Sequence, residues 1–171
     1  MPLRRDLSIC HTWDGEPLPE GEAASLVLHM SDEGLSLEIE APFAGDPPPP
    51  SAPGETWKLW EHEVVELFVC GPKEQYTEIE VGPHGHFLVL RLEGVRNIVA
   101  RVNALTLKNH RPRAGRWRAS AFLPAEHLPA QPWRINAYRI SGVAETRAYA
   151  AAFPSKGPAP DFHRLESFEA W

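Results

Sequence analysis

The stretch LWEHEVVELFV, residues 59–69, decides the fold of this chain. Residues 64–70, VVELFVC, are rich in β-branched and aromatic side chains, which predicts a buried β-strand. Side chains alternate between the two faces of a strand. One face of this strand therefore carries only valine and leucine, while Glu66 shares the other face with Phe68. A carboxylate in such a strand needs a partner, a ligand or open water, because burying an unpaired charge is costly.

The neighbouring segment QYTEIEV, residues 75–81, alternates in the same way. Tyr76, Glu78 and Glu80 are expected on one face, with Thr, Ile and Val on the other. If this strand pairs with the strand of Glu66, two or three carboxylates gather on one face of the sheet near the tyrosine.

Short alternating segments bounded by Gly and Pro continue along the chain, and none shows helical periodicity over the 10–12 residues that a confident amphipathic helix needs. This pattern predicts an all-β sandwich or barrel, with one domain spanning residues 1–171. Residues 111–115 are expected to form a hairpin turn, and residues 125–132 at most one helical turn. The further expected strands are residues 25–30, 35–43, 86–94, 99–109, 116–124, 133–141 and 147–154.

Residues 45–54, GDPPPPSAPG, interrupt this pattern with four consecutive prolines. Proline donates no ladder hydrogen bond, so the segment is expected to be a polyproline II loop on the surface. A ligand for a proline-recognition domain is the alternative reading of the same residues.

Composition limits the classes of function. The net charge of −6 disfavours a nucleic-acid partner, since there is no excess of basic charge to displace counterions from phosphates. No run approaches the roughly 20 apolar residues of a membrane span, and no apolar signal-peptide core follows the N-terminal arginines. We therefore expect a cytoplasmic protein without a membrane partner, in which Cys10 and Cys70 are reduced. The sequence does not indicate an oligomeric state.

Three explanations of Glu66 remain open from the residues alone. It forms an internal ion pair with an arginine, for which Arg91, Arg96, Arg134 and Arg139 are candidates. It belongs to a sugar site, where an aromatic ring stacks on the apolar face of a pyranose and planar polar groups bind its hydroxyls. Or it acts with Glu78 or Glu80 as the acid and base of a glycosidase.

Several stretches, taken together, resemble the family 9 carbohydrate-binding modules, and more closely the bacterial single-domain DOMON-like modules of that type. Their order and spacing carry the resemblance, which covers the last two-thirds of the chain. The matching stretches are LWEHEVVELFV (59–69), YTEIEVGPHGHF (76–87), AFLPAEHLP (121–129), WRINAYRI (133–140) and YAAAFPSKGPAPDFH (149–163).

The resemblance implies a DOMON-like antiparallel β-sandwich and a non-catalytic sugar binder. Characterised modules of the family hold a terminal sugar between two Trp side chains, with a Glu on its hydroxyls. Trp60 and Glu66 match the first Trp and the Glu by spacing. The second Trp has no counterpart in residues 149–153, where Phe153 is the nearest aromatic, and Glu80 replaces a common Asn.

We therefore predict weak binding of a small saccharide or glycan end, with no catalytic residue, metal or cofactor. The alternatives are a glycoside-active enzyme that uses paired carboxylates, and a structural or partner-binding module without sugar binding. The predicted ligand-binding residues are Trp60, Glu66, Glu78, Arg96, Arg139 and Phe153.

Other residues that could bind a metal or a haem are expected to have structural roles instead. His84 and His86 form an H-x-H pair without a marked third ligand, so a solvated turn is expected rather than a metal site. Asp161 and His163 are expected to cap the tail locally against the sheet. Met30 is expected to pack in the core rather than bind a haem.

Overall fold

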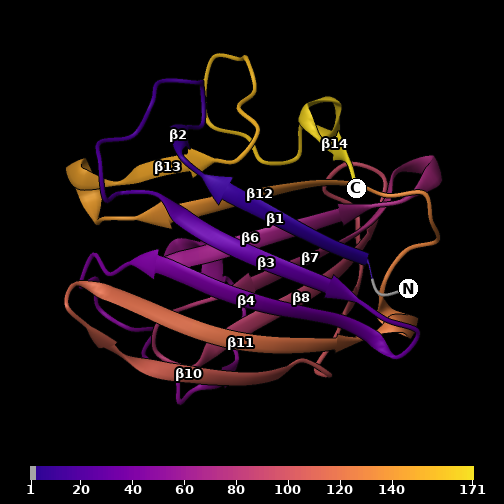
Figure 1. Cartoon of the computed structure of the whole chain (residues 1–171), viewed down its shortest axis with the longest axis horizontal. Coiled ribbons are helices and arrows are strands. Elements are labelled where there is room, and N and C mark those ends of the chain that lie inside the picture. Colours follow the sequence, from indigo (N-terminus) through magenta and orange to yellow (C-terminus); the bar gives the residue numbers. More distant parts are fainter. Residues whose placement is uncertain (1–2) are drawn as a thin grey trace.

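A computed structural model describes residues 3–171 as two antiparallel sheets packed face to face (Figure 1). The first sheet is the nearer one in Figure 1, and its strands run in the order β1-β3-β4-β11-β10. Its strands are β1 (Leu3–Ile9), β3 (Ala24–Met30), β4 (Gly34–Pro42), β11 (Arg116–Pro124) and β10 (Thr106–Arg113).

The second sheet follows the order β2-β13-β12-β6-β7-β8-β5, with β14 paired to β12 and β9 paired to β8. Within residues 3–171 the strands of this sheet pair antiparallel, except β5 and β8, which pair in parallel. The strands of the second sheet are β2 (His11–Thr12), β5 (Gly54–Glu55), β6 (Val64–Cys70), β7 (Gln75–Val81), β8 (His86–Glu93), β9 (Ile98–Arg101), β12 (Arg134–Ser141), β13 (Ala148–Ala151) and β14 (Glu169–Ala170).

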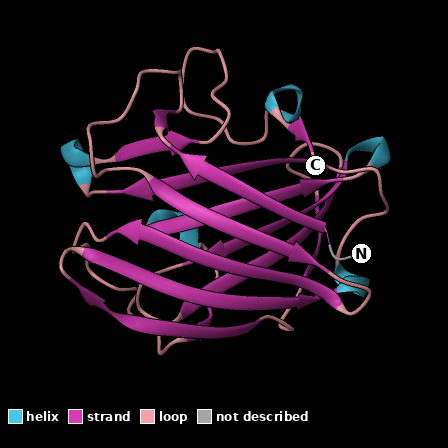
Figure 2. Cartoon of the chain, in the orientation of Figure 1, coloured by secondary structure: helices cyan, strands magenta, loops and turns pink. Residues whose placement is uncertain are grey.

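Helical structure in the described part of the chain is limited to three-residue 3₁₀ turns at the ends of strands (Figure 2). None of these turns has the length and hydropathy that a membrane span requires. The turns are η1 (Leu59–Glu61), η2 (Pro72–Glu74), η3 (Ala125–His127), η4 (Ala144–Thr146) and η5 (Leu165–Ser167). The all-β sandwich expected from the sequence is therefore confirmed.

The main core lies between the two sheets, where apolar side chains of both inner faces interlock. Leu37 of β4 and Trp117 of β11 pack there with Leu67 of β6 and Ile79 of β7, and all four are at most 2% exposed. A second apolar cluster covers the outer face of the second sheet, where Phe68 packs with aromatic residues of the C-terminal tail. The second sheet is thus buried on both faces, because the tail folds over it.

The alternation read from the sequence places most strands correctly, but several segments differ, among them 147–154, where β13 spans only Ala148–Ala151. Residues 99–109 form two strands in different sheets, because Val102 and Leu105 turn into the core between β9 and β10. The expected turn at 111–115 is shorter, since β10 continues to Arg113 past an irregularity in its pairing with β11. The sequence reading also assigned no strand to β1, a sheet-edge strand whose outward positions carry charged side chains.

The proline-rich segment forms no strand before Gly54 and is mostly exposed. It is nevertheless tethered, because Asp46 accepts the Gly142 backbone N–H at 2.7 Å and His86 bonds the Ser51 carbonyl at 2.9 Å.

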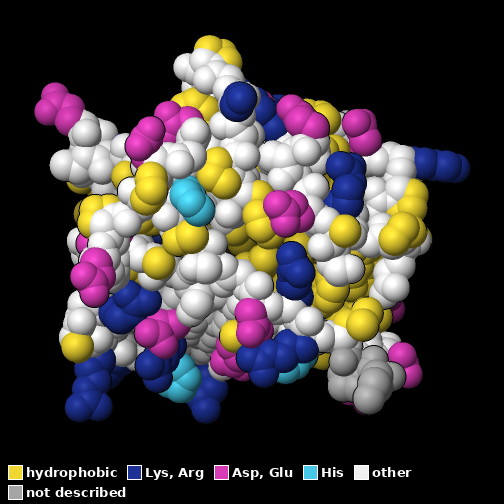
Figure 3. Space-filling view, turned by 45° about the horizontal axis from the view of Figure 1, so that its top comes forward, with side chains coloured by type: hydrophobic (Ala, Val, Ile, Leu, Met, Phe, Trp, Pro, Cys, Tyr) yellow, Lys and Arg dark blue, Asp and Glu magenta, His cyan; other side chains and the backbone are white. Residues whose placement is uncertain are grey.

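Figure 3 shows acidic and basic side chains interspersed over one face of the molecule, so the net negative charge is not gathered there into one acidic patch.

A buried amide fixes the tail to the second sheet. The Asn136 side chain of β12 accepts the backbone N–H groups of Ala137 and Phe153 and donates to the Phe153 carbonyl at 2.8 Å. Its Nδ2 also reaches the Tyr138 hydroxyl at 2.9 Å and the Ser167 hydroxyl at 3.2 Å. One side chain thus joins β12, the segment that follows β13 and the tail.

Replacing this amide tests its role. Asn136→Ala should lower the free energy of unfolding by about 2–3 kcal/mol, because it leaves backbone groups in a dry interior without partners. The exposed Asn97→Ala, which loses one side-chain bond to the Glu93 carbonyl, should cost less than about 1 kcal/mol. Urea unfolding of both variants measures the difference, and equal losses would refute the anchoring role.

Candidate functional site: a cavity over three buried carboxyl groups

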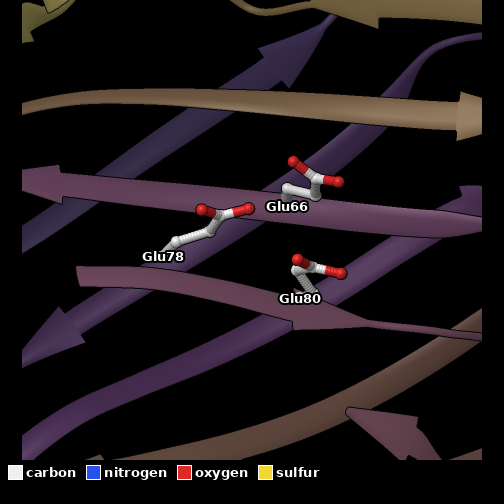
Figure 4. A group of neighbouring side chains, drawn as sticks. All are labelled: Glu66, Glu78 and Glu80. Atoms are coloured by element: carbon white, nitrogen blue, oxygen red, sulfur yellow. The ribbon is translucent and has the colours of Figure 1, made fainter. Parts of the chain in front are cut away.

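The pairing of β6 with β7 brings three glutamates together. Glu66 stands directly opposite Glu80, and Phe68 stands opposite Glu78, so all three carboxyl groups leave the same outer face of the sheet. One oxygen from each lies within 4.8 Å of the others (Figure 4). The side chains of Glu66, Glu78 and Glu80 belong to residues that are 2%, 4% and 0% exposed, so this is a buried cluster.

No Lys or Arg in residues 3–171 forms an ion pair with any of these three carboxyl groups; the nearest basic group is His163, whose Nε2 is 4.0 Å from Glu78 Oε2. One oxygen of Glu66 and both oxygens of Glu80 have no hydrogen-bond partner in this part of the chain. The internal ion pair considered for Glu66 from the sequence is therefore absent from the described residues.

The environment raises the pKa of every member of the cluster, and burial is the largest cause in each case. The pKa of Glu78 rises to about 7. The pKa of Glu66 rises well above its usual range through burial and the charge of Glu78. The pKa of Glu80 does so through burial and then the charges of Glu66 and Glu78. At neutral pH the cluster therefore holds protons unless a cation compensates its charge.

A cavity of about 490 Å³ opens above this cluster, with Glu66 and Glu78 in its wall. Apolar side chains of β8, β9 and β12 form another part of the wall, and residues of the tail also line it. Aromatic rings from three separate segments face the same space, namely Trp60, Tyr149 and Phe162. The remaining lining residues are Glu61, Leu90, Leu92, Arg96, Ile98, Ile140, Arg147, Pro160, Asp161 and His163.

Tyr76 and His163 form a polar pair at the edge of the cavity. The Tyr76 hydroxyl accepts the Arg96 backbone N–H at 3.0 Å and lies 2.7 Å from His163 Nδ1. Burial lowers the pKa of His163 to about 4, so its ring is neutral at pH 7. The simplest proton arrangement has the hydroxyl donating to Nδ1, which leaves the proton on Nε2, the nitrogen nearer to Glu78.

Both arginines of the cavity wall are already engaged. Arg96 donates to Asp161 Oδ1 at 2.7 Å, and Asp161 also caps the His163 backbone N–H. Arg147 donates to the backbone carbonyls of Trp60 and Glu61, and its guanidinium lies 5.7 Å from the Tyr149 ring centre. These contacts fix the tail and the Trp60 turn, so neither cation compensates the carboxyl cluster directly.

Four of the six residues predicted to bind a ligand, Trp60, Glu66, Glu78 and Arg96, line this one cavity. The structure does not bring Arg139 there. In β12, Tyr138 is the residue opposite Glu66, so Arg139 points to the other face, where it lines a different cavity and lies 3.9 Å from Glu63.

Phe153 is also elsewhere, because β13 ends at Ala151 and the chain then turns. Its backbone is held by Asn136, and its ring packs against the main core between the sheets. Tyr149, which the sequence reading passed over, supplies the aromatic ring of this segment to the cavity. Strand alternation gives Tyr149 and Phe153 the same side and so does not choose between them. The pairing of β12 with β13 does, because it sets Tyr149 opposite Ile140, which also lines the cavity.

The tail residues were only partly anticipated. The local capping by Asp161 is confirmed, but the same segment also supplies Phe162 and His163 to the cavity wall. The expectation that His84 and His86 lie on a solvated turn is wrong for His86. That ring is 2% exposed and fixes the proline-rich loop, while His84 packs its edge against Phe43.

Solved structures share this fold, among them a family 9 carbohydrate-binding module. A Bacteroides uniformis protein described as a candidate carbohydrate binder superposes with a TM-score of 0.74 at 15% identity, covering 98% of this chain and 84% of its own. A family 9 module from Caldicellulosiruptor kristjanssonii in complex with glucose gives 0.61 at 13% identity, covering 94% and 81%. The fold resemblance seen in the sequence is thereby confirmed.

Sequence comparison then gives the family. No family model matches the chain. The rat UPF0462 protein C4orf33 homolog is 40% identical over 173 residues, which cover 96% of this chain and 86% of the rat protein. The human UPF0462 protein C4orf33 is 38% identical, covering 97% and 87%. The chain therefore belongs to the UPF0462 family.

The raised pKa of Glu78 makes stability depend on pH. Because the folded protein binds this proton more tightly than the unfolded chain, stability should fall as pH rises from about 4.5 through 7. The shift corresponds to a loss of about 3 kcal/mol. Glu78→Gln should show a shallower fall, since a neutral amide has no charge to bury.

The exposed Glu126→Gln is the matched control, and it should keep the wild-type slope. Chemical unfolding of the three proteins at pH 5, 6, 7 and 8 in metal-free buffer measures the slopes. Identical slopes for Glu78→Gln and the wild type would show that Glu78 is not held neutral by the fold.

Proposed function

We propose that this protein is a non-catalytic carbohydrate-binding module that binds a small saccharide, or the end of a glycan, in the cavity beside Trp60. The observation that carries the proposal is the combination of rings and polar groups in one wall: Trp60 and Tyr149 lie with Glu66, Glu78 and His163 around about 490 Å³. Ligand pockets typically hold about 300–1,000 Å³ and combine apolar walls with a few polar groups.

The chemistry of the wall suits a sugar. A pyranose presents C–H groups to an aromatic ring on one face and hydroxyls around its rim. Trp60 is half-buried, with its ring 5.1 Å from that of the exposed Trp57 in an edge-to-face contact. The unpaired carboxyl oxygen of Glu66 can accept a hydroxyl hydrogen, and the same carboxyl in its protonated form can donate. The related folds that carry glucose or cellotriose support this class of ligand.

Hydrolysis is less well supported by the same residues. A retaining glycosidase needs one ionised carboxylate as a nucleophile beside a protonated acid. The pKa values of Glu66 and Glu78 are both raised, and no Lys or Arg of residues 3–171 pairs with either to hold it ionised. The arrangement therefore favours binding over a carboxylate-driven cleavage.

Trp60→Ala tests the site. The wild type should bind glucose or cellobiose with a dissociation constant of about millimolar to high micromolar, because Tyr149 offers less aromatic area than a second Trp. Removing the Trp60 ring should weaken binding at least about tenfold, while Trp60→Phe, which keeps a platform, should lose less. Titration calorimetry against a panel of mono- and disaccharides measures this.

Two results would contradict the proposal. One is low-micromolar sugar binding that Trp60→Ala leaves unchanged, which would place the ligand elsewhere. The other is the absence of binding to every sugar of the panel by a folded wild-type protein, which would favour a structural or partner-binding role.

A further inference from the structure

The carboxyl cluster under the cavity has the geometry of an ion site. One oxygen each from Glu66, Glu78 and Glu80 lies within 4.8 Å of the others, and two of these residues also line the cavity (Figure 4). Two oxygens on opposite sides of a calcium ion are about 4.6–5.2 Å apart, since each bond measures about 2.3–2.6 Å. The cavity gives such an ion a route from solvent and room for water ligands.

A second observation points to a ligand independently of this grouping. Glu80 is 0% exposed, yet both of its oxygens lack a hydrogen-bond partner among the described residues. The Trp60 backbone N–H approaches Glu80 and lowers its pKa, and the nearby Glu78 carboxyl raises it. The Trp60 N–H does not meet the geometry of a hydrogen bond, and an ionised Glu78 offers no donor.

Another buried glutamate shows how this protein satisfies such a group elsewhere. Glu63 is 3% exposed, and its two oxygens accept the backbone N–H groups of Ala44 at 2.8 Å and Asp46 at 3.3 Å. Arg139 lies 3.9 Å away as a counter-charge. The buried carboxylate of Glu63 thus has hydrogen-bond donors for both oxygens and a nearby arginine. Among the described residues, Glu80 has neither a hydrogen-bond donor nor a paired arginine.

The chain's own cations near the cavity are already committed. Arg96 is paired with Asp161, and Arg147 is bonded to the carbonyls of Trp60 and Glu61. Arg147 and Arg96 act on Glu66 and Glu78 only through their charge at a distance, so the charge of three ionised carboxylates is balanced either by protons or by a bound cation. A cation between three glutamates has only oxygen ligands, which favours hard divalent ions over zinc or copper.

We propose that Glu66, Glu78 and Glu80 together bind one hard divalent cation, with Ca²⁺ preferred. Calcium accepts irregular oxygen geometry, whereas Mg²⁺ requires a near-ideal octahedron with shorter bonds. Glu80 does not line the cavity, so a small ion reaches it where a bulkier ammonium group would contact only the outer two carboxylates. The cation site concerns these residues alone and stands whether or not the cavity takes a saccharide.

Titration of the full chain with CaCl₂ alone, without sugar, tests this site. Calorimetry at pH 7.5 after chelator treatment should show one ion per chain with a dissociation constant of about 0.01–1 mM, the range of the weaker protein calcium sites. In 5 mM CaCl₂ the melting temperature should rise by about 5 °C. MgCl₂ and MnCl₂ are titrated in parallel.

Glu80→Gln keeps the shape of the side chain and removes one charge, so it should fold and bind calcium at least tenfold more weakly. Glu66→Gln is the second variant of the cluster, and Glu126→Gln, far more exposed, should bind like the wild type. The proposal is overturned if none of the three ions shifts the melting temperature or gives heat. It is equally overturned if the folded Glu80→Gln variant binds calcium as the wild type does.

Discussion

The constraint on which the site depends is the burial of three carboxyl groups at neighbouring positions of two paired strands. The pairing of β6 with β7 fixes Glu66 opposite Glu80, and Glu78 lies one pleat away on the same face. A one-residue slip in this pairing would bring the apolar inner face into the cavity and the carboxyl groups into the core. The core between the sheets, with Leu67 and Ile79, therefore also fixes the register of the site.

The C-terminal tail turns this sheet face into a cavity. Phe162 stacks on Tyr138 with ring centres 3.9 Å apart, and Phe168 packs edge-on against Phe68. These contacts remove water from the sheet face, which raises the pKa values of the glutamates below. Between the tail and the sheet lies the cavity that Trp60 and Arg96 line. The C-terminal tail thus both buries the glutamates and forms part of the cavity wall.

The sequence predicts the fold well because its strands alternate strictly. The bounds of β6, β7 and β11 follow from alternation and from Gly and Pro punctuation. Alternation does not predict the edge strand β1 or the division of residues 99–109 between β9 and β10. Tertiary packing decides which sheet each of these segments joins. For the same reason, motif spacing brought Trp60 and Glu66 together correctly but misplaced Arg139, whose side of the sheet depends on its register with β6. Phe153 was misplaced because strand β13 ends two residues before it.

The central claim is that the space above Glu66 and Glu78 is a ligand site. Amide NMR spectra recorded during titration with glucose to tens of millimolar would test it most directly, because even weak binding shifts the signals of contacting residues. The account predicts shifts confined to the Trp60 turn, the strands of the two glutamates and the tail around His163. An absence of shifts, or shifts centred on the separate cavity beside Arg139, would contradict it.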